Sequence, residues 1–431
     1  MLKTFSRNVE YFEINPIDHE IDVEIEIPSS KSFTHRAFII AALSNGDSTI
    51  LKPLASEDTL LTLEALKKMG VPIKEIKGGY LIHGTAGKLE VPNVDIMLNN
   101  SGTSLRLLTS VATLADGEVV LTGNERMCER PVKDLIDALY NLGVKIEYLN
   151  KPGYPPVKIS SNFEGGKTHL RGDVSSQYFS SILICAPYAK KDVEIIPTTH
   201  IKSKPYIDIT IEMMEKFGVV VKSEDIFKVK SGQSYKATDY VVEGDFSSAS
   251  YFFAATAVLG GSIRIFNLNR NSNQGDRSFL NYMSIMGCNV TYTENYIELE
   301  RDPRKPLKGI EVDMKNTPDI VQTLAIVACF ASSPTIIRNI AHLRHKETDR
   351  IKSTATELRK LGVIVRTTND SITIHPPKKL KSATIETYND HRTAMSFSIA
   401  GLKIPGVVVK NPECVKKSFP DFYHILQKIY A

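Results

Sequence analysis

The sequence predicts an α/β protein of two similar lobes, each built from three copies of one repeated unit. The chain has 431 residues, which is too long for one ordinary hydrophobic core. A helix end followed by β-rich residues recurs at intervals of roughly 70 to 75 residues. The chain also begins with β-rich residues that have no unit of their own, while its last unit lacks a closing hairpin.

The first recurring element is a helix that ends in an apolar residue and a glycine. Glycine in this position takes the left-handed conformation that ends a helix, and the residues after it are patterned as β-hairpins. We therefore predict a helix and a hairpin in each of five segments. These are ALKKMGVPI, ALYNLGVKI, MMEKFGVVV, YMSIMGCNV and ELRKLGVIV, with Gly70, Gly143, Gly218, Gly287 and Gly362.

The second recurring element is a helix that precedes each of these and appears six times. Each copy begins with Ser, Thr, Asp or Asn, which are N-cap residues. Each is then apolar on nearly every side, which is typical of a buried helix, and a short β-branched strand follows. The copies are SKSFTHRAFIIAALSNG, NNSGTSLRLLTSVATLADG, VSSQYFSSILICAPYAKK, DFSSASYFFAATAVLGG, NTPDIVQTLAIVACFASS and NDHRTAMSFSIAGLKIPG.

The sixth unit starts near Asn389 and reaches the end of the sequence without its hairpin. We expect a strand in the N-terminal segment KTFSRNVEYFEIN to complete it. Units one to three then form a first lobe, residues 22–243, and units four to six form a second, residues 1–21 plus 244–431. We expect a cleft between the lobes, with buried helix N-termini directed at it. Such ends carry unpaired N–H groups and partial positive charge, and therefore attract anions.

Composition excludes several classes of protein. The formal net charge of +4 is too small to indicate a nucleic-acid partner, and neither a membrane-spanning run nor a signal core is visible. The five cysteines are odd in number and far apart, so we expect no disulfides and a reducing cytoplasm; Cys185, Cys288 and Cys329 are interpreted as core thiols. Metal-ligand spacings such as HExxH are absent, so we expect no metal. The other cysteines are Cys128 and Cys414.

Candidate functional residues gather at the starts of the units and in the loops before the second helices. A surplus of Arg and Lys there predicts small, multiply anionic ligands, while Asp319 and Glu347 offer proton-transfer groups. The unit starts supply Lys31, Arg36, Asn100, Gly102, Arg106, Ser175, Ser176, Gln177, Asp319 and Arg392. The loops supply Arg126, Ser203, Tyr206, Lys346, Glu347, Arg350 and Lys417.

Structural alternatives exist for several of these residues. Charge runs such as RHKETDR, residues 344–350, are usually solvated faces, although its place in the unit matches those of RMCERP, SKPY and KKSFPD and favours a site. Ser175 and Ser176 are explained equally well as N-caps. Asp319 also fits a helix-start acid, and Arg106 a brace for its loop.

The motifs KSFTHR, NNSGTSLR, RMCERP, SSQ, SKPYIDIT, KETDR, NDHRTAM and KKSFPD span nearly the whole chain. Together they resemble the 5-enolpyruvylshikimate-3-phosphate (EPSP) synthase family. The resemblance implies lobes of three βαβαββ units, the enolpyruvyl transferase fold or inside-out α/β barrel. It also implies transfer of the enolpyruvyl group from phosphoenolpyruvate to the 5-hydroxyl of shikimate 3-phosphate through a tetrahedral intermediate. The reaction releases phosphate, needs no cofactor and belongs to the chorismate pathway.

By the same resemblance, Asp319 would deprotonate the 5-hydroxyl, while Glu347 and Lys31 would handle the proton added to the methylene carbon. Shikimate 3-phosphate would contact Lys31, Ser32, Arg36, Ser175, Ser176, Gln177, Ser203, Tyr206, Asp319 and Lys346. Phosphoenolpyruvate would contact Lys31, Asn100, Gly102, Arg126, Gln177, Arg350, Arg392 and Lys417. The inhibitor glyphosate would occupy the phosphoenolpyruvate site, and we expect a monomer. Ser29 and His342 depart from the Gly and Asn common in the family.

Two other functions share features of this sequence. A transferase that adds enolpyruvate to UDP-N-acetylglucosamine shares the repeat, but it carries a reactive Cys in a glycine-rich loop. Here that loop reads GNERMCERPV, without the Gly-Cys context. An RNA-end-processing or nucleic-acid-binding protein on related repeats would show a broad basic surface with interleaved aromatics, whereas this chain has no Trp and places its cations singly.

Overall fold

The structure, a computed structural model, describes residues 10–430 and divides into two compact units. One unit, here called the first lobe, is Ser29–Glu243. The second lobe comprises the described residues up to Pro28 and those from Gly244 onward. Each lobe has its own hydrophobic core. Within residues 10–430, no helix is long and apolar enough to cross a membrane.

The lobe boundary lies later than the predicted residue 22. Strand β2 (Ile21–Glu26) pairs in parallel with β15 (Gly261–Phe266) and therefore belongs to the second lobe. The equivalent strand of the first lobe is β14 (Tyr240–Val241), which pairs in parallel with β3 (Asn45–Leu51). In both lobes, therefore, the chain forms one parallel edge strand just before it crosses to the other lobe. An alternating pattern identifies a strand but not its partner, so the sequence alone did not place β2.

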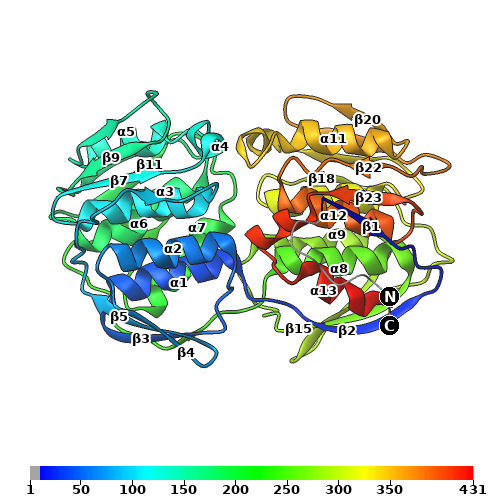
Figure 1. Ribbon diagram of the computed structural model, residues 1–431, viewed down its shortest axis with the longest axis horizontal. Coiled ribbons are helices and arrows are strands. Elements are labelled where there is room, and N and C mark those ends of the chain that lie inside the picture. Colours follow the sequence, from blue (N-terminus) through cyan, green and yellow to red (C-terminus); the bar gives the residue numbers. More distant parts are fainter. Residues whose placement is uncertain (1–9, 431) are drawn as a thin grey trace. The chain divides into compact units, whose positions relative to one another are not determined.

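Three buried helices form the interior of the first lobe (Figure 1): α1 (Lys31–Leu43), α3 (Gly102–Val111) and α6 (Ser176–Cys185). Helix α3 packs on α6. Amphipathic helices α2 (Glu57–Lys68), α5 (Lys133–Asn141) and α7 (Pro205–Lys216) pack against this group.

The strands of the first lobe form three four-stranded sheets with the same pattern. In each, the first two strands are parallel and the following hairpin is antiparallel. The first sheet has the order β14, β3, β5 (Gly79–Thr85) and β4 (Ile73–Ile76). The second sheet has the order β6 (Ile96–Met97), β7 (Glu118–Thr122), β9 (Val157–Ser160) and β8 (Ile146–Tyr148). The third has the order β10 (Gly166–Leu170), β11 (Val193–Pro197), β13 (Phe227–Val229) and β12 (Val221–Ser223).

The second lobe repeats this arrangement. Its buried helices, α8 (Phe246–Leu259), α10 (Val321–Ala328) and α12 (His391–Gly401), pack on one another. Outer helices are α9 (Ser278–Met286), α11 (Arg350–Lys360) and α13 (Phe422–Leu426). Two sheets run β16 (Asn289–Tyr292), β17 (Tyr296–Arg301), β15, β2, and β18 (Glu311–Asp313), β19 (Thr335–Arg338), β21 (Ile372–His375), β20 (Ile364–Thr367).

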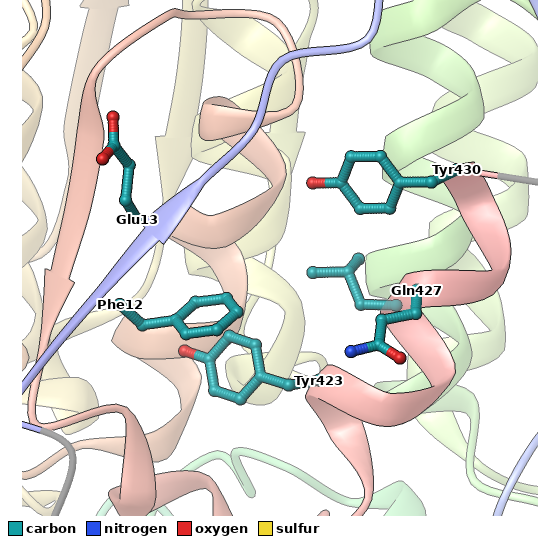
Figure 2. Close-up of a pocket in the computed structure, with 6 residues that line it drawn as sticks. Phe12, Glu13, Tyr423, Gln427 and Tyr430 are labelled. Carbon is teal, nitrogen blue, oxygen red and sulfur yellow. The ribbon is translucent and has the colours of Figure 1, made fainter. Parts of the chain in front are cut away.

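The N-terminal strand joins the sixth unit. Strand β1 (Tyr11–Ile14) runs antiparallel to β23 (Val407–Lys410), which is parallel to β22 (Thr384–Ile385). Residues 3–9 of the predicted N-terminal segment lie outside the described residues. Figure 2 shows a small pocket where β1 meets α13 and the turn η7 (Gln427–Tyr430). It is lined by Phe12, Glu13, Tyr423, Leu426, Gln427 and Tyr430, and none of these was a predicted site residue.

The glycine helix ends predicted from the repeat are confirmed, and four of the six predicted N-caps are, whereas the starts of α1 and α10 have no side-chain cap. All five glycines after the outer helices have positive φ, between 82° at Gly70 and 111° at Gly287. Side chains of Ser101, Ser175, Asp245 and Asp390 cap the buried helices α3, α6, α8 and α12 by accepting backbone N–H bonds. All five cysteines are free thiols, and Cys185, Cys288 and Cys329 are buried as expected.

Candidate active site

The second lobe holds a buried cluster of charge around Arg350, the first residue of α11. Its guanidinium donates to Asp390 (Nε to Oδ2, 2.7 Å), to Glu347 (Nη2 to Oε2, 2.8 Å) and to Asp319 (Nη1 to Oδ1, 3.0 Å). Burial lowers the pKa of Arg350, but the three carboxylates, Asp390 foremost, together hold that pKa above its ordinary value. Arg350 therefore stays charged and fixes both predicted proton-transfer groups, because each side chain is bonded to it directly.

Asp319 lies between two arginines. Its other oxygen, Oδ2, accepts from Nη2 of Arg392 at 2.9 Å, and Nη1 of Arg392 also donates to the Tyr251 hydroxyl at 3.3 Å. Asp319 belongs to the 3₁₀ turn η4 (Pro318–Ile320) that leads into α10, and Arg392 stands in the first turn of α12. The starts of two buried helices thus bring a carboxylate and a guanidinium into contact, and both belong to the residues predicted at the unit starts.

The run RHKETDR divides into structural and inward-facing residues. Arg344, in the turn η5 (Ala341–His345), pairs with Asp349 at 2.7 Å and donates to the carbonyls of Thr368 and Asn369. Asp349 also caps α11 by accepting from the Lys352 N–H. Arg344 and Asp349 are thus partly buried and serve the local fold through these bonds. Glu347 and Arg350 belong instead to the buried cluster.

In the first lobe, Lys31 begins α1 and binds a buried acid. Its Nζ lies 3.0 Å from Oδ2 of Asp58, whose side chain is 3% exposed. Asp58 is in the first turn of α2, a position that also favours a negative charge through the helix dipole. The ion pair fixes the direction of the lysine while leaving its side chain 14% exposed. Lys31 is therefore held in position and remains accessible.

Arg36 is a buried cation whose partners are neutral. It donates to the Thr210 and Ser180 hydroxyls at 2.6 and 3.1 Å, and to the carbonyls of Ser32 and Tyr206. No carboxylate pairs with it among residues 10–430, and burial lowers its pKa to about 10. An uncompensated buried charge is costly, so this site is electrostatically prepared for an anion.

The starts of α3 and α6 are connected by side chains. Gln177 accepts from Arg106 Nη1 at 2.7 Å and donates to the Thr103 hydroxyl at 2.9 Å. Ser175 accepts from the Gln177 N–H and is therefore the N-cap of α6, as one interpretation proposed. Arg106 braces Gln177, which supports its structural interpretation.

Gly102 opens α3 directly against Arg130. A Cβ at this glycine would lie 2.5 Å from Nη2 of Arg130. Arg130 also donates to the carbonyl and side chain of Asn100 at 3.3 Å, so the loop and the arginine form one unit. Arg126, on the short helix α4 (Glu125–Cys128), is more exposed and pairs with Glu129 at 2.9 Å.

The remaining predicted residues lie in the loops as expected. Ser203 is buried with a φ of +57°, two residues before α7, and Tyr206 is the second residue of that helix. Ser32 and Ser176 stand in the first turns of α1 and α6. Lys346 follows η5, and Lys417 is buried at the end of the turn η6 (Pro412–Lys417). Ser29 donates to the Val242 carbonyl, and His342 is buried in η5.

Sequence reasoning missed four residues of these clusters: Asp58, Arg130, Asp390 and Asp276. Asp390 was visible as the acid of NDHR, but only its role as an N-cap type was noticed. Asp58, in the first turn of α2, and Arg130, in the loop after α4, both follow other polar residues, and nothing local marks them as buried. Asp276, a buried acid in the turn η3 (Gly275–Arg277), gave no repeat-level signal.

The sheets and buried helices define a class: α/β proteins of six repeated units in two lobes, with charged side chains at the helix starts. The chain is similar to solved structures of EPSP synthase from Acinetobacter baumannii, with a TM-score of 0.82, 28% identity and 98% of both chains covered in one of them. The family model EPSP synthase (3-phosphoshikimate 1-carboxyvinyltransferase) matches residues 17–426. The chain belongs to the EPSP synthase family.

Curated relatives agree with this assignment. A 3-phosphoshikimate 1-carboxyvinyltransferase of Methanoculleus marisnigri is 46% identical over 94% of this chain and 96% of its own length. One of Methanospirillum hungatei is 48% identical over 94% and 95%. Neither the UDP-N-acetylglucosamine transferase nor the RNA-processing alternative is favoured by these matches.

Proposed function

We propose that this chain transfers the enolpyruvyl (1-carboxyvinyl) group of phosphoenolpyruvate to the 5-hydroxyl of shikimate 3-phosphate and releases phosphate. The chain is a transferase of aromatic amino acid biosynthesis by its family. The observation that carries the proposal for its chemistry is Asp319 held between Arg350 and Arg392 with Glu347 on the same guanidinium. Two carboxylates and two cations in one buried cluster suit a reaction in which protons and negative charge both move.

In the proposed addition step, Asp319 takes the proton of the 5-hydroxyl while the oxygen attacks C2 of phosphoenolpyruvate. Glu347 and Lys31 deliver a proton to the methylene carbon, which gives the tetrahedral intermediate. In the elimination, the Glu347 and Lys31 pair that gave this proton takes one back from the methyl carbon, the new C=C bond forms, and the C–O bond to phosphate breaks so that phosphate leaves. Arg350 and Arg392 stabilise the anionic groups throughout, because fixed cations in a site of low water content interact strongly with developing charge.

Binding roles follow the same division. We assign the carboxylate and phosphate of phosphoenolpyruvate to Lys31, Asn100, Gly102, Arg126, Gln177, Arg350, Arg392 and Lys417. For shikimate 3-phosphate the proposed contacts are Lys31, Ser32, Arg36, Ser175, Ser176, Gln177, Ser203, Tyr206, Asp319 and Lys346. Arg36 supports the second set, because its buried charge has only neutral partners and an anionic ligand would compensate it.

We propose that glyphosate competes for the phosphoenolpyruvate groups, that the chain works as a monomer in the cytoplasm, and that it has no nucleic-acid partner. The five free thiols fit a reducing compartment. The proposal includes no metal or organic cofactor.

A coupled assay of phosphate release tests the function. Phosphate should appear from phosphoenolpyruvate only when shikimate 3-phosphate is present, and UDP-N-acetylglucosamine should not replace it. Asp319→Asn should lose roughly 100-fold or more in kcat, because a general base contributes about that much. Release of phosphate at the same rate without shikimate 3-phosphate would exclude the proposed reaction.

A further inference from the structure

A further buried carboxyl group of the second lobe interacts electrostatically with Asp319 and has no role in the chemistry described above. Asp276 is 3% exposed in the turn η3. The Ser247 hydroxyl donates to its Oδ2. Its other oxygen, Oδ1, is buried and has no hydrogen-bond partner among residues 10–430.

The chain before Asp276 is tied to the start of α8. The Gln274 side chain accepts from the Phe246 N–H at 3.0 Å and donates to the Gly244 carbonyl at 2.8 Å. Both η3 and η4, the turn that carries Asp319, pack against α8. Tyr282 on α9 also contacts Thr317, two residues before Asp319, through their hydroxyls at 3.4 Å. These contacts fix Asp276 and Asp319 on neighbouring turns.

The groups around Asp276 couple it to the proposed base. Burial, and after it the charge of Asp319, raise the pKa of Asp276 to about 7 against the opposing effects of Arg392 on α12 and of the Ser247 hydroxyl. Asp245 at the start of α8 adds a smaller effect that also raises this pKa, and Tyr282 on α9 senses the charge of Asp276. Because electrostatic interaction is mutual, ionised Asp276 must also increase the affinity of Asp319 for a proton.

A structural role does not account for this carboxyl group. A serine or asparagine at the position would bond to Ser247 equally well, without the cost of a buried acid that lacks a partner on one oxygen. A negative charge near Asp319, in contrast, would change the basicity of Asp319. Two guanidiniums bind Asp319 and stabilise its ionised form, which weakens it as a base.

We propose that Asp276 is a positioning residue for proton transfer, which strengthens Asp319 as a base against the opposing charges of Arg350 and Arg392. The inference rests on the proposed role of Asp319. Asp276 itself takes no proton from substrate: the proton moves from the 5-hydroxyl oxygen to Asp319, and the negative charge of Asp276 makes that transfer more favourable.

The test compares the pH profiles of kcat for the wild type and Asp276→Asn, measured by phosphate release from pH 5.5 to 9. In the wild type, kcat should rise by about 3- to 10-fold as Asp276 ionises near pH 7, a fraction of a full general-base effect. In Asp276→Asn this rise should be missing and kcat should stay near the low-pH value. A variant that keeps the wild-type rise, whatever its absolute rate, would overturn the proposal.

Two further variants complete the test. Ser247→Ala removes the hydrogen bond that favours ionised Asp276, so the rise should move to higher pH; an unmoved rise would overturn the proposal even if Asp276→Asn does not fold. Asp302→Asn is the matched control, because Asp302 pairs with Arg304 in a turn at 2.8 Å and its pKa is lowered to about 2. It should leave the profile unchanged. A wild type without any turnover would instead contradict the proposed function.

Discussion

The guanidinium of Arg350, 1% exposed, binds the carboxylate of Asp319 at 3.0 Å. A cation of the proposed phosphoenolpyruvate site is thereby also the residue that orients the proposed base. Removal of this arginine would release the acid and leave other buried carboxylates without their cation. The stability of the second lobe and the chemistry of the site therefore depend on the same side chain.

Arg350→Ala should destabilise the protein strongly. The change leaves Asp390 and Glu347 buried without the charge that compensates them, and breaking such a pair typically costs about 3–5 kcal/mol. Urea unfolding followed by circular dichroism measures the loss. Arg344→Ala, in the same charged run but 28% exposed, is the control and should cost less than about 1 kcal/mol. Equal midpoints for the two variants would contradict the buried-cluster interpretation.

Glu347→Gln should separate catalysis from stability. The amide oxygen can still accept from Arg350 Nη2, now 2.8 Å from Oε2, so the fold should lose at most about 1–2 kcal/mol. Turnover should fall roughly 100-fold or more, because the amide cannot deliver or take a proton. Steady-state kinetics give kcat and the KM for each of the two substrates. Glu413→Gln, at an exposed pair with Lys416, serves as control. Full turnover in Glu347→Gln would remove this carboxylate from the proton-transfer step.

Gly102→Ala should weaken phosphoenolpyruvate binding. The added methyl group would lie 2.5 Å from the Arg130 guanidinium, which must then shift together with Asn100, bonded to it at 3.3 Å. We expect the KM for phosphoenolpyruvate to rise by about 10-fold, equivalent to roughly 1.4 kcal/mol, with a smaller change for shikimate 3-phosphate. Gly232→Ala, where nothing lies within 4 Å of the added Cβ but φ is +76°, should cost some stability through backbone strain and leave both KM values unchanged. Equal changes in both KM values would count against a local effect.

Much of this fold could be predicted because the same local sequence pattern occurs in several units. Gly70 or Gly287 alone would be weak signals, but five glycines in one context predicted five left-handed helix ends. Serine or aspartate at successive helix starts predicted caps for the same reason. The contacts between residues far apart in the sequence could not be predicted. The pairing of β2 with the second lobe depends on a distant strand, and Asp276 interacts electrostatically with Asp319 only because two 3₁₀ turns pack on one helix.

Asp276→Asn should change how stability depends on pH. The pKa of Asp276 is raised from 3.8 to about 7 in the folded state, so the folded protein binds this proton more tightly than the unfolded chain does. The wild type therefore loses stability as the pH rises from about 4 to about 7, whereas the asparagine variant does not. Because the shift spans about three pKa units, the free energy of unfolding of the variant, relative to the wild type, should increase by about 4 kcal/mol across this window. Parallel curves in urea titrations at pH 5 and pH 8 would refute the shift.

Lys31 gives the final prediction, in which catalysis and ion pairing can be separated within the first lobe. Lys31→Ala should abolish measurable turnover, because one accessible cation at the start of α1 is proposed to contact both substrates. It should also cost stability, since Asp58, 3% exposed, loses a partner 3.0 Å away. The loss should be about 1–3 kcal/mol, as for other buried charged groups that lose a hydrogen bond.

The double variant Lys31→Ala with Asp58→Asn decides between the two effects of that lysine. Removal of the buried negative charge should restore much of the lost stability, because a neutral pair no longer leaves a charge uncompensated. Turnover should stay absent, since the cation itself is missing. Lys67→Ala, at an exposed pair with Glu64, should match the wild type in both measurements. If the double variant recovers turnover together with stability, Lys31 serves the fold of the lobe and its proposed contact with substrate is wrong.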